Sequence, residues 1–210
     1  MRRMGFVAVL GVGILSLLPT RLFAAPVTIV DTGNAGAAGP ITSLGHPFDQ
    51  AWLAAEFTTA LAYEITSVEG WFEVYDAGGP LQVSLYSDGG EIPGALLFSQ
   101  ISLQSPGGLA WRGVSGLSWV IAPGTYWVSF EAPGAILNAG VPTNAATTPL
   151  ANEATLNRFN GFVWTEFDDL NMAIRIFGDD DPAVAPEPSS FFLFATGLAG
   201  VTLYRRRRES

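Results

Sequence analysis

LQVSLY, residues 81–86, alternates apolar and polar side chains, so that Leu81, Val83 and Leu85 share one face of an extended chain. TYWVSFE, residues 125–131, alternates in the same way. A period of two over such short segments is the pattern of a half-buried β-strand. In the second stretch the two opposite faces are Tyr126, Val128 and Phe130 against Trp127, Ser129 and Glu131.

The middle of the chain repeats this pattern of short strands separated by turns. Further strands are predicted at 27–31, 63–75, 95–103, 117–121, 159–167 and 172–176. Clusters of Gly and Pro, which reverse the chain easily, lie between them at 76–80, 88–90, 93–94, 106–108, 123–124 and 133–134. This spacing predicts an all-β protein, which we expect to be an antiparallel β-sandwich or jelly-roll-like ectodomain.

Three segments do not follow the strand pattern. Residues 51–62 are rich in Ala, which suits a helix, but Phe57, Thr58 and Thr59 favour an extended chain. Residues 134–154 are rich in Ala, Asn, Thr and Pro and are expected to form one long loop. Residues 179–188 combine charge and proline, which predicts a solvated linker.

The first 24 residues have the features of a secretory signal peptide. Arg2 and Arg3 precede an apolar run of 14 residues, 5–18, and small residues follow at Ala24 and Ala25. At ~1.5 Å per residue this run reaches only ~21 Å, less than the ~30 Å core of a bilayer. We therefore expect cleavage after Ala24, and the alternative is an uncleaved anchor. A cleaved leader implies the Sec translocon and signal peptidase as partners.

The last 25 residues have a three-part order: a short proline motif, an apolar run and a basic block. The apolar run extends over 189–204, or ~24 Å, which snorkelling arginines and local thinning can extend to a membrane span. The positive-inside rule places the basic tail, 205–210, in the cytoplasm. A nucleic-acid-binding tail is the alternative for this block, and export argues against it. The sorting residues are Pro186, Glu187, Pro188, Arg205, Arg206, Arg207 and Arg208.

This arrangement resembles the PEP-CTERM sorting signal of exported proteins in Gram-negative bacteria. The resemblance implies recognition by an exosortase, removal of the hydrophobic tail and delivery to the cell surface. It also implies an association with exopolysaccharide and biofilm matrix. A GPI-type signal is the nearest alternative, but it would not need the terminal arginines. The expected organisation is signal peptide 1–24, ectodomain 25–178, linker 179–188, transmembrane segment 189–204 and basic tail 205–210.

Composition limits the chemistry of the ectodomain. The chain contains no cysteine, so a disulfide framework, a thiol nucleophile and a cysteine-ligated metal are excluded. Between residues 25 and 185 three arginines stand against seventeen aspartates and glutamates, a formal charge of about −14. This charge repels nucleic acid and anionic lipid.

The aromatic residues suggest a carbohydrate-binding alternative. Six tryptophans are many for this length, and exposed indole rings could stack on sugar rings. Trp71 and Trp111, beside Gly70 and Arg112, are the candidates for a solvent-facing platform. The competing interpretation places most tryptophans in the core.

Catalytic and metal sites have weaker support. His46 is the single histidine, and no nucleophile elbow accompanies it. Paired carboxylates of a glycoside hydrolase could come from Glu69 and Glu73, or from Glu166 and Asp168. Calcium could be bound by acids in or beside turns, although no regular calcium-loop spacing is present. These calcium candidates are Asp76, Asp88, Glu91, Asp168 and Asp169.

A second, weaker resemblance concerns the ectodomain. Residues 85–94 and 123–127 resemble the β-sandwich domains that often precede PEP-CTERM tails. The step from Pro123 to Tyr126 is also similar to a tyrosine corner, which implies a bond from the phenol to nearby backbone. The sequence therefore predicts a non-enzymatic surface or matrix protein. A carbohydrate-binding module is the first alternative, and an extracellular hydrolase is the second.

Overall fold

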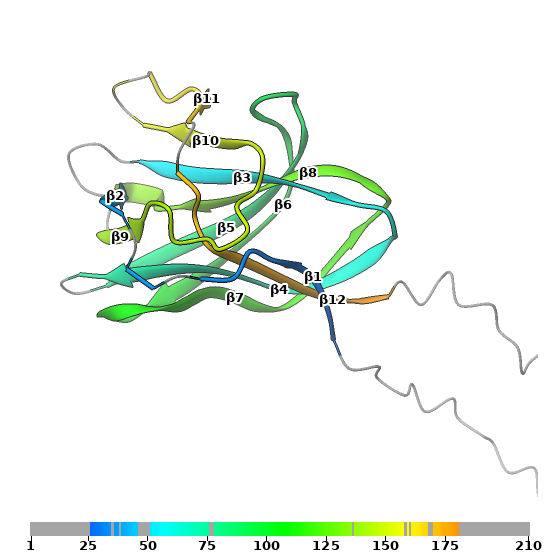
Figure 1. Cartoon of the computed structure of the whole chain (residues 1–210), viewed down its shortest axis with the longest axis horizontal. Coiled ribbons are helices and arrows are strands. Elements are labelled where there is room, and N and C mark those ends of the chain that lie inside the picture. The colour runs from blue at the N-terminus through cyan, green and yellow to red at the C-terminus, as the bar shows by residue number, and fades with distance from the viewer. Residues whose placement is uncertain are drawn as a thin grey trace, which may run out of the picture.

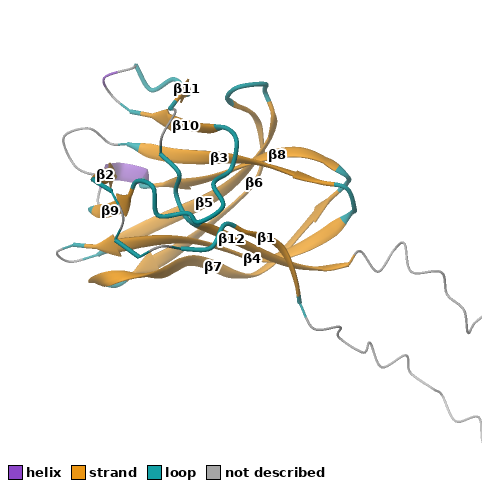
Figure 2. Cartoon of the chain, viewed as in Figure 1, coloured by secondary structure: helices purple, strands orange, loops and turns teal. Residues whose placement is uncertain are grey.

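The computed structural model describes residues 26–34, 36–37, 39–45, 51–75, 78–135, 137–157, 159, 161–167 and 170–180. Almost all regular structure in this part is β-strand, as Figure 2 shows. The strands are β1 (Val27–Asp31), β2 (Ile41–Leu44), β3 (Trp52–Thr59), β4 (Tyr63–Val74), β5 (Gly79–Asp88), β6 (Pro93–Gln104), β7 (Gly107–Ile121), β8 (Gly124–Glu131), β9 (Ala139–Pro142), β10 (Glu153–Leu156), β11 (Thr165–Glu166) and β12 (Ile174–Asp180). A 3-10 turn, η1 (Pro133–Ala135), follows β8.

The strands form two antiparallel sheets, which lie as two layers in Figure 1. The first sheet has the order β1-β12-β4-β9-β2, and β7 pairs with β4. The second has the order β11-β10-β3-β8-β5-β6. The prediction of an all-β protein with antiparallel sheets is confirmed for the described residues. The predicted signal peptide and transmembrane segment lie outside them.

One hydrophobic core joins the two sheets. Phe72 of the first sheet and Phe130 of the second meet edge to face, with ring centroids 6.1 Å apart. Gly70 makes room for this contact, because a Cβ there would lie 3.0 Å from the Phe130 ring. Such close interdigitation is what a well-packed protein interior requires. Leu81, Val83 and Leu85 are fully buried in this core, as their alternation predicts.

The predicted strands agree with the structure wherever alternation is strong. Residues 27–31 are β1, and 63–75, 81–86, 95–103 and 125–131 fall on β4, β5, β6 and β8. The extended form expected at 57–59 is part of β3. The proposed tyrosine corner is also confirmed, because the Tyr126 hydroxyl donates to the Ala122 carbonyl at 3.0 Å.

Three expectations from the sequence were wrong. Residues 134–154 are not one loop, because β9 and the start of β10 lie within them. Only Thr165–Glu166 of the predicted strand 159–167 is a strand, since Gly161 and Phe162 adopt φ values of 75° and 58° and turn the chain. β7 begins at Gly107, inside a predicted turn, because its first half pairs with β4.

β8 is also buried more completely than a half-buried strand would be. Trp127 and Ser129, which point away from the main core, are both 0% exposed. Trp127 packs with Ala54 and Ala154, and the partly buried rings of Tyr86 and Trp164 cover it. The outer side of this sheet therefore has a second, smaller core.

The first and last strands of the domain, β1 and β12, lie side by side. β1 and β12 pair antiparallel, so that Val27 lies opposite Gly178 (Figure 1). The chain on either side of the domain is therefore joined to it at neighbouring points.

Replacing a core leucine tests this arrangement. We expect Leu85→Ala to lower the free energy of unfolding by about 2–5 kcal/mol, because it leaves a cavity between the sheets. Leu103→Ala is the matched control, since Leu103 is 83% exposed. Its unfolding free energy should change by less than about 0.5 kcal/mol. Urea unfolding followed by tryptophan fluorescence measures both, and equal effects would contradict the assigned core.

Candidate functional site

Trp71 and Trp111, predicted from sequence as a possible platform, lie directly opposite each other on β4 and β7. Gly70 and Phe72 face the core, so Trp71 between them points to the outer face of the sheet. Trp111 shares this face because cross-strand partners lie on the same side. The ring centroids are 5.4 Å apart and the ring planes meet at 62°. The two half-buried rings therefore touch edge to face and do not form one flat platform.

Arg175 adds a charge to this pair from β12. Its guanidinium carbon lies 4.0 Å from the centre of the Trp111 ring, a cation–π contact. Its Nε donates to Asp31 at 3.2 Å across β1 and β12. Glu69 lies opposite Arg175 in the pairing of β4 with β12. We define Asp31, Glu69, Trp71, Trp111 and Arg175 as the outer-face cluster.

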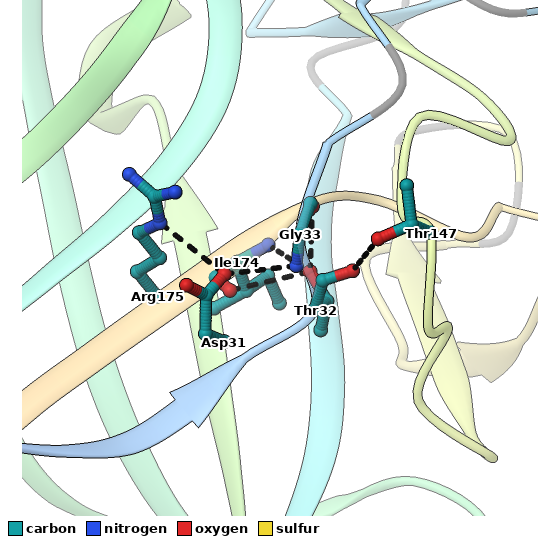
Figure 3. A network of polar contacts seen from close by, with 6 residues as sticks. All are labelled: Asp31, Thr32, Gly33, Thr147, Ile174 and Arg175. Carbon is teal, nitrogen blue, oxygen red and sulfur yellow. Dashed lines mark hydrogen bonds and ion pairs between the residues drawn. The ribbon is translucent and has the colours of Figure 1, made fainter.

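The end of β1, which carries Asp31, is held firmly in place. Figure 3 shows Thr32 beside Ile174, with its hydroxyl accepting the Ile174 N–H at 2.7 Å. The Thr32 carbonyl accepts the hydroxyl of Thr147 at 3.0 Å. Asp31 itself accepts the N–H of Gly33 at 2.8 Å. These bonds fix the carboxylate that orients Arg175.

Tyr75 and Glu73 extend this face along β4. The Tyr75 hydroxyl donates to the Glu73 carboxylate. Burial, with the bond to Glu73 and its negative charge, raises the pKa of Tyr75 to about 12. A Cβ on Gly140 would lie 2.3 Å from the Tyr75 hydroxyl oxygen, so the phenol packs directly on this glycine of β9. Tyr75 is therefore a neutral hydrogen-bond donor at neutral pH.

Arrangements of this kind can hold a polar, ring-shaped ligand. Indole rings offer apolar contact, while a guanidinium and carboxylates exchange hydrogen bonds with hydroxyl groups. The Nε1 of Trp71 limits the contact that this ring can make with a ligand, because the atom is buried. It has no acceptor among the described residues. Trp111 and Arg175 are therefore the members best placed to meet a ligand.

Two glutamates that the sequence analysis did not single out are buried. Glu131 on β8 is 1% exposed and accepts from Gln82 at 2.6 Å, from Tyr86 at 2.8 Å and from Ser129 at 2.5 Å. Burial and then the charge of Glu131 raise the pKa of Tyr86 above its ordinary value. Three donors compensate the cost of burying this carboxylate. The alternation of β5 and β8 predicts that Glu131 and its three donors share the outer face of the sheet. It does not predict that this face is buried.

The second of these glutamates, Glu153 on β10, lies on the inner side of the second sheet. It is 5% exposed and accepts the backbone N–H of Met172 at 2.9 Å and that of Asn171. Burial raises the pKa of Glu153 to about 7, although the two backbone bonds act in the opposite direction. The carboxyl therefore fastens the segment before β12 to the second sheet.

Of the five calcium candidates, the structure describes only Asp88 and Glu91. Asp88 and Glu91 lie at the turn between β5 and β6, where Asp88 accepts the N–H of Gly90 at 2.7 Å. Among the residues that the structure describes, no three His, Asp or Glu side chains group closely enough to hold a metal ion. Asp76, Asp168 and Asp169 lie outside that part, as does His46.

The carboxylate pair Glu69 and Glu73 shares one face of β4, as predicted. Residues four apart on a strand are separated by roughly 13 Å, and Trp71 lies between these two. Glycosidase carboxylates are only about 5–10 Å apart. For the second pair, Glu166 is exposed on β11 and Asp168 lies outside the described residues.

Comparison with known proteins identifies the C-terminal segment. Residues 184–208 match the PEP-CTERM protein-sorting motif, a range that contains Pro186, Glu187, Pro188 and Arg205 to Arg208. The chain therefore carries a PEP-CTERM sorting signal, which marks it as an exported protein and as an exosortase target. No curated protein matches the chain, and no solved structure does. Within the described residues, the structure contains no helix with the length and hydropathy to cross a membrane.

The pKa of Glu153 predicts a dependence of stability on pH. The folded state keeps the proton up to about pH 7, whereas an ordinary glutamate releases it near 4.5. The free energy of unfolding should therefore fall between pH 4.5 and 7, by up to about 3 kcal/mol from this group.

Urea unfolding at a series of pH values, with Glu153→Gln, tests this dependence. The variant should be less stable at low pH, since its amide NH₂ cannot accept both backbone N–H groups, and it should lose the slope. Glu91→Gln, at an exposed turn, should keep it. An unchanged slope in Glu153→Gln would assign the dependence to another group.

Proposed function

We propose that this chain is an exported cell-surface or extracellular-matrix protein with a non-enzymatic, structural or adhesive role in exopolysaccharide or biofilm. Its route begins at the Sec translocon and signal peptidase. The tail then holds it in the inner membrane, with a β-sandwich ectodomain in the periplasm, until an exosortase releases it to the surface. The observation that carries the proposal is the sorting motif at 184–208.

The geometry of the domain supports this role. β1 and β12 are paired neighbours, so the sorting tail is joined to the domain at one end. The buried carboxylates have structural partners: Glu131 binds three side chains and Glu153 binds two backbone N–H groups. These acids stabilise the fold, which suits a structural protein. An extracellular glycoside hydrolase ranks last, because Glu69 and Glu73 are far apart on one strand.

Glu187→Ala tests the sorting step. We expect the unaltered chain to lose its arginine-bearing tail and leave the inner membrane, whereas the variant stays at full length there. Intact mass and cell fractionation measure both properties. Asp181→Ala is the matched control, since it removes an acid just outside the matched range 184–208 and should be processed normally.

Two outcomes would contradict the proposal. If the unaltered chain and Glu187→Ala both keep residues 189–210, the tail is an anchor and no exosortase acts on it. If both lose the tail equally, the proline motif is not what the enzyme recognises.

Carbohydrate binding is the second candidate function, and the outer-face cluster favours it. Trp71 and Trp111 lie together on an outward face, with Arg175 over one ring and Asp31 and Glu69 beside it. Aromatic faces, a guanidinium and carboxylates are the groups that contact sugars. In this role the protein would hold exopolysaccharide directly.

Trp111→Ala tests sugar binding. We expect it to weaken binding to the host's isolated exopolysaccharide by about tenfold, because a stacked ring contributes about 1 kcal/mol or more. Phe159→Ala is the control, since Phe159 is 79% exposed and lies on none of the strands that carry the cluster. Sedimentation of the protein with the polymer measures both. Equal binding by the two variants would remove the cluster from consideration.

A further inference from the structure

β6 is the edge strand of the second sheet, and one side of it is unprotected. Among the described strands it pairs only with β5. An edge strand presents a row of N–H and C=O groups that can pair with another chain. Natural edges usually carry charges, prolines or strong bulges that prevent this pairing. β6 has one proline, Pro93, at its first position, and its irregularities of register lie toward that end.

The sequence of this edge is uncharged and apolar. No Asp, Glu, Lys, Arg or His occurs from Ile92 to Trp111, although the domain carries about −14. Leu96, Leu97 and Ile101 are 53%, 43% and 50% exposed, and Leu103 is 83% exposed. Exposed apolar side chains gathered on one strand indicate an interaction surface.

The inner side of β6 is held in place by β7. Phe98 stacks on Trp119, with ring centroids 5.7 Å apart. Ser102 Oγ and Gln104 Nε2 donate to the Gly113 carbonyl at 2.9 and 3.2 Å. The strand is therefore well ordered, and its middle, around Ser99, is exposed.

The charges at the two ends of β6 are opposite. Asp88 and Glu91 lie where the strand begins. At the other end the Arg112 guanidinium donates to the carbonyls of Ser105 at 3.0 Å and Gly108 at 3.1 Å. A two-fold axis near Ser99 would place Glu91 of each copy by residue 107 of the other, next to Arg112. Such a pair is complementary in charge, and most other contacts between two acidic domains would repel.

We propose that β6 binds a second copy of this chain, strand against antiparallel strand, so that two domains share one continuous sheet. In this pair, Leu96 and Leu97 of one copy lie by Ile101 and Leu103 of the other, and their apolar surface is covered. The inference goes beyond the surface role proposed above, because it names the chain itself as a partner.

Disulfide trapping of the full-length chain in its host tests the proposal. The chain has no cysteine, so a single Ser99→Cys gives a disulfide only with another copy or another thiol. We expect mild oxidation of the exported fraction to give a dimer on a non-reducing gel. Its yield should be at least about tenfold above that of Thr28→Cys, an exposed site on β1, the edge of the other sheet.

Adding Ile101→Glu to Ser99→Cys should return the dimer to the control level, because it places a carboxylate against the apolar Leu97 of the other copy. Ile101 is half exposed, so the fold should tolerate the change, and circular dichroism checks this. Equal yields from the two single-cysteine chains, or a yield that Ile101→Glu does not lower, would overturn the pairing. A disulfide only to another protein would also overturn it. Dimers are scored among exported molecules with or without the tail, so failure of the sorting proposal would be seen separately.

Discussion

The pairing of β4 with strands on both of its edges is the constraint on which the rest of the structure depends. β12 and β9 pair along one side of β4 and β7 along the other, so segments from three other parts of the chain are aligned against one strand. The core side of β4 places Phe72 against Phe130 of the second sheet. Its outer side places Trp71 against Trp111 and Glu69 opposite Arg175. One strand thus sets both the packing of the two layers and the composition of the outer face.

The second physical feature is how few positive charges the domain has, and what they do. Arg112 gives its guanidinium to three backbone carbonyls, those of Phe72, Ser105 and Gly108. Arg175 binds Asp31 and stacks on Trp111. Exposed ion pairs contribute little stability, about 0–1 kcal/mol, so the value of these arginines lies in orientation rather than in strength. The remaining surface is strongly acidic, so it repels nucleic acid and anionic lipid.

The two buried acids, like the arginines, orient the groups around them. Glu131 lies on the outer side of the second sheet, where a small core around Trp127 excludes water. Glu153 lies at the inner side, where the segment before β12 crosses to the other sheet. A buried carboxylate destabilises the fold unless donors surround it, and each of these has at least two. Both therefore make the local arrangement specific, since no apolar side chain could bind the same groups.

The sequence by itself determined the fold class and the sorting signal. Alternation in residues 81–86 and 125–131 needs only neighbouring residues to be read, and the sorting motif is a contiguous segment. Trp71 and Trp111 were predicted as candidates for a solvent-facing platform, but their edge-to-face contact depends on the register of two strands forty residues apart. Arg175 and Asp31 were not foreseen as neighbours, because a strand pair formed by the two ends of the domain leaves no local pattern. β9 was missed for the same reason: AGVP is a strand only because β2 and β4 lie beside it.

Local periodicity fixes which face of a strand is apolar, whereas the partners and register of each strand come from packing the whole chain. Partners and register decided the outer-face cluster, the surroundings of the buried glutamates and the open edge of β6.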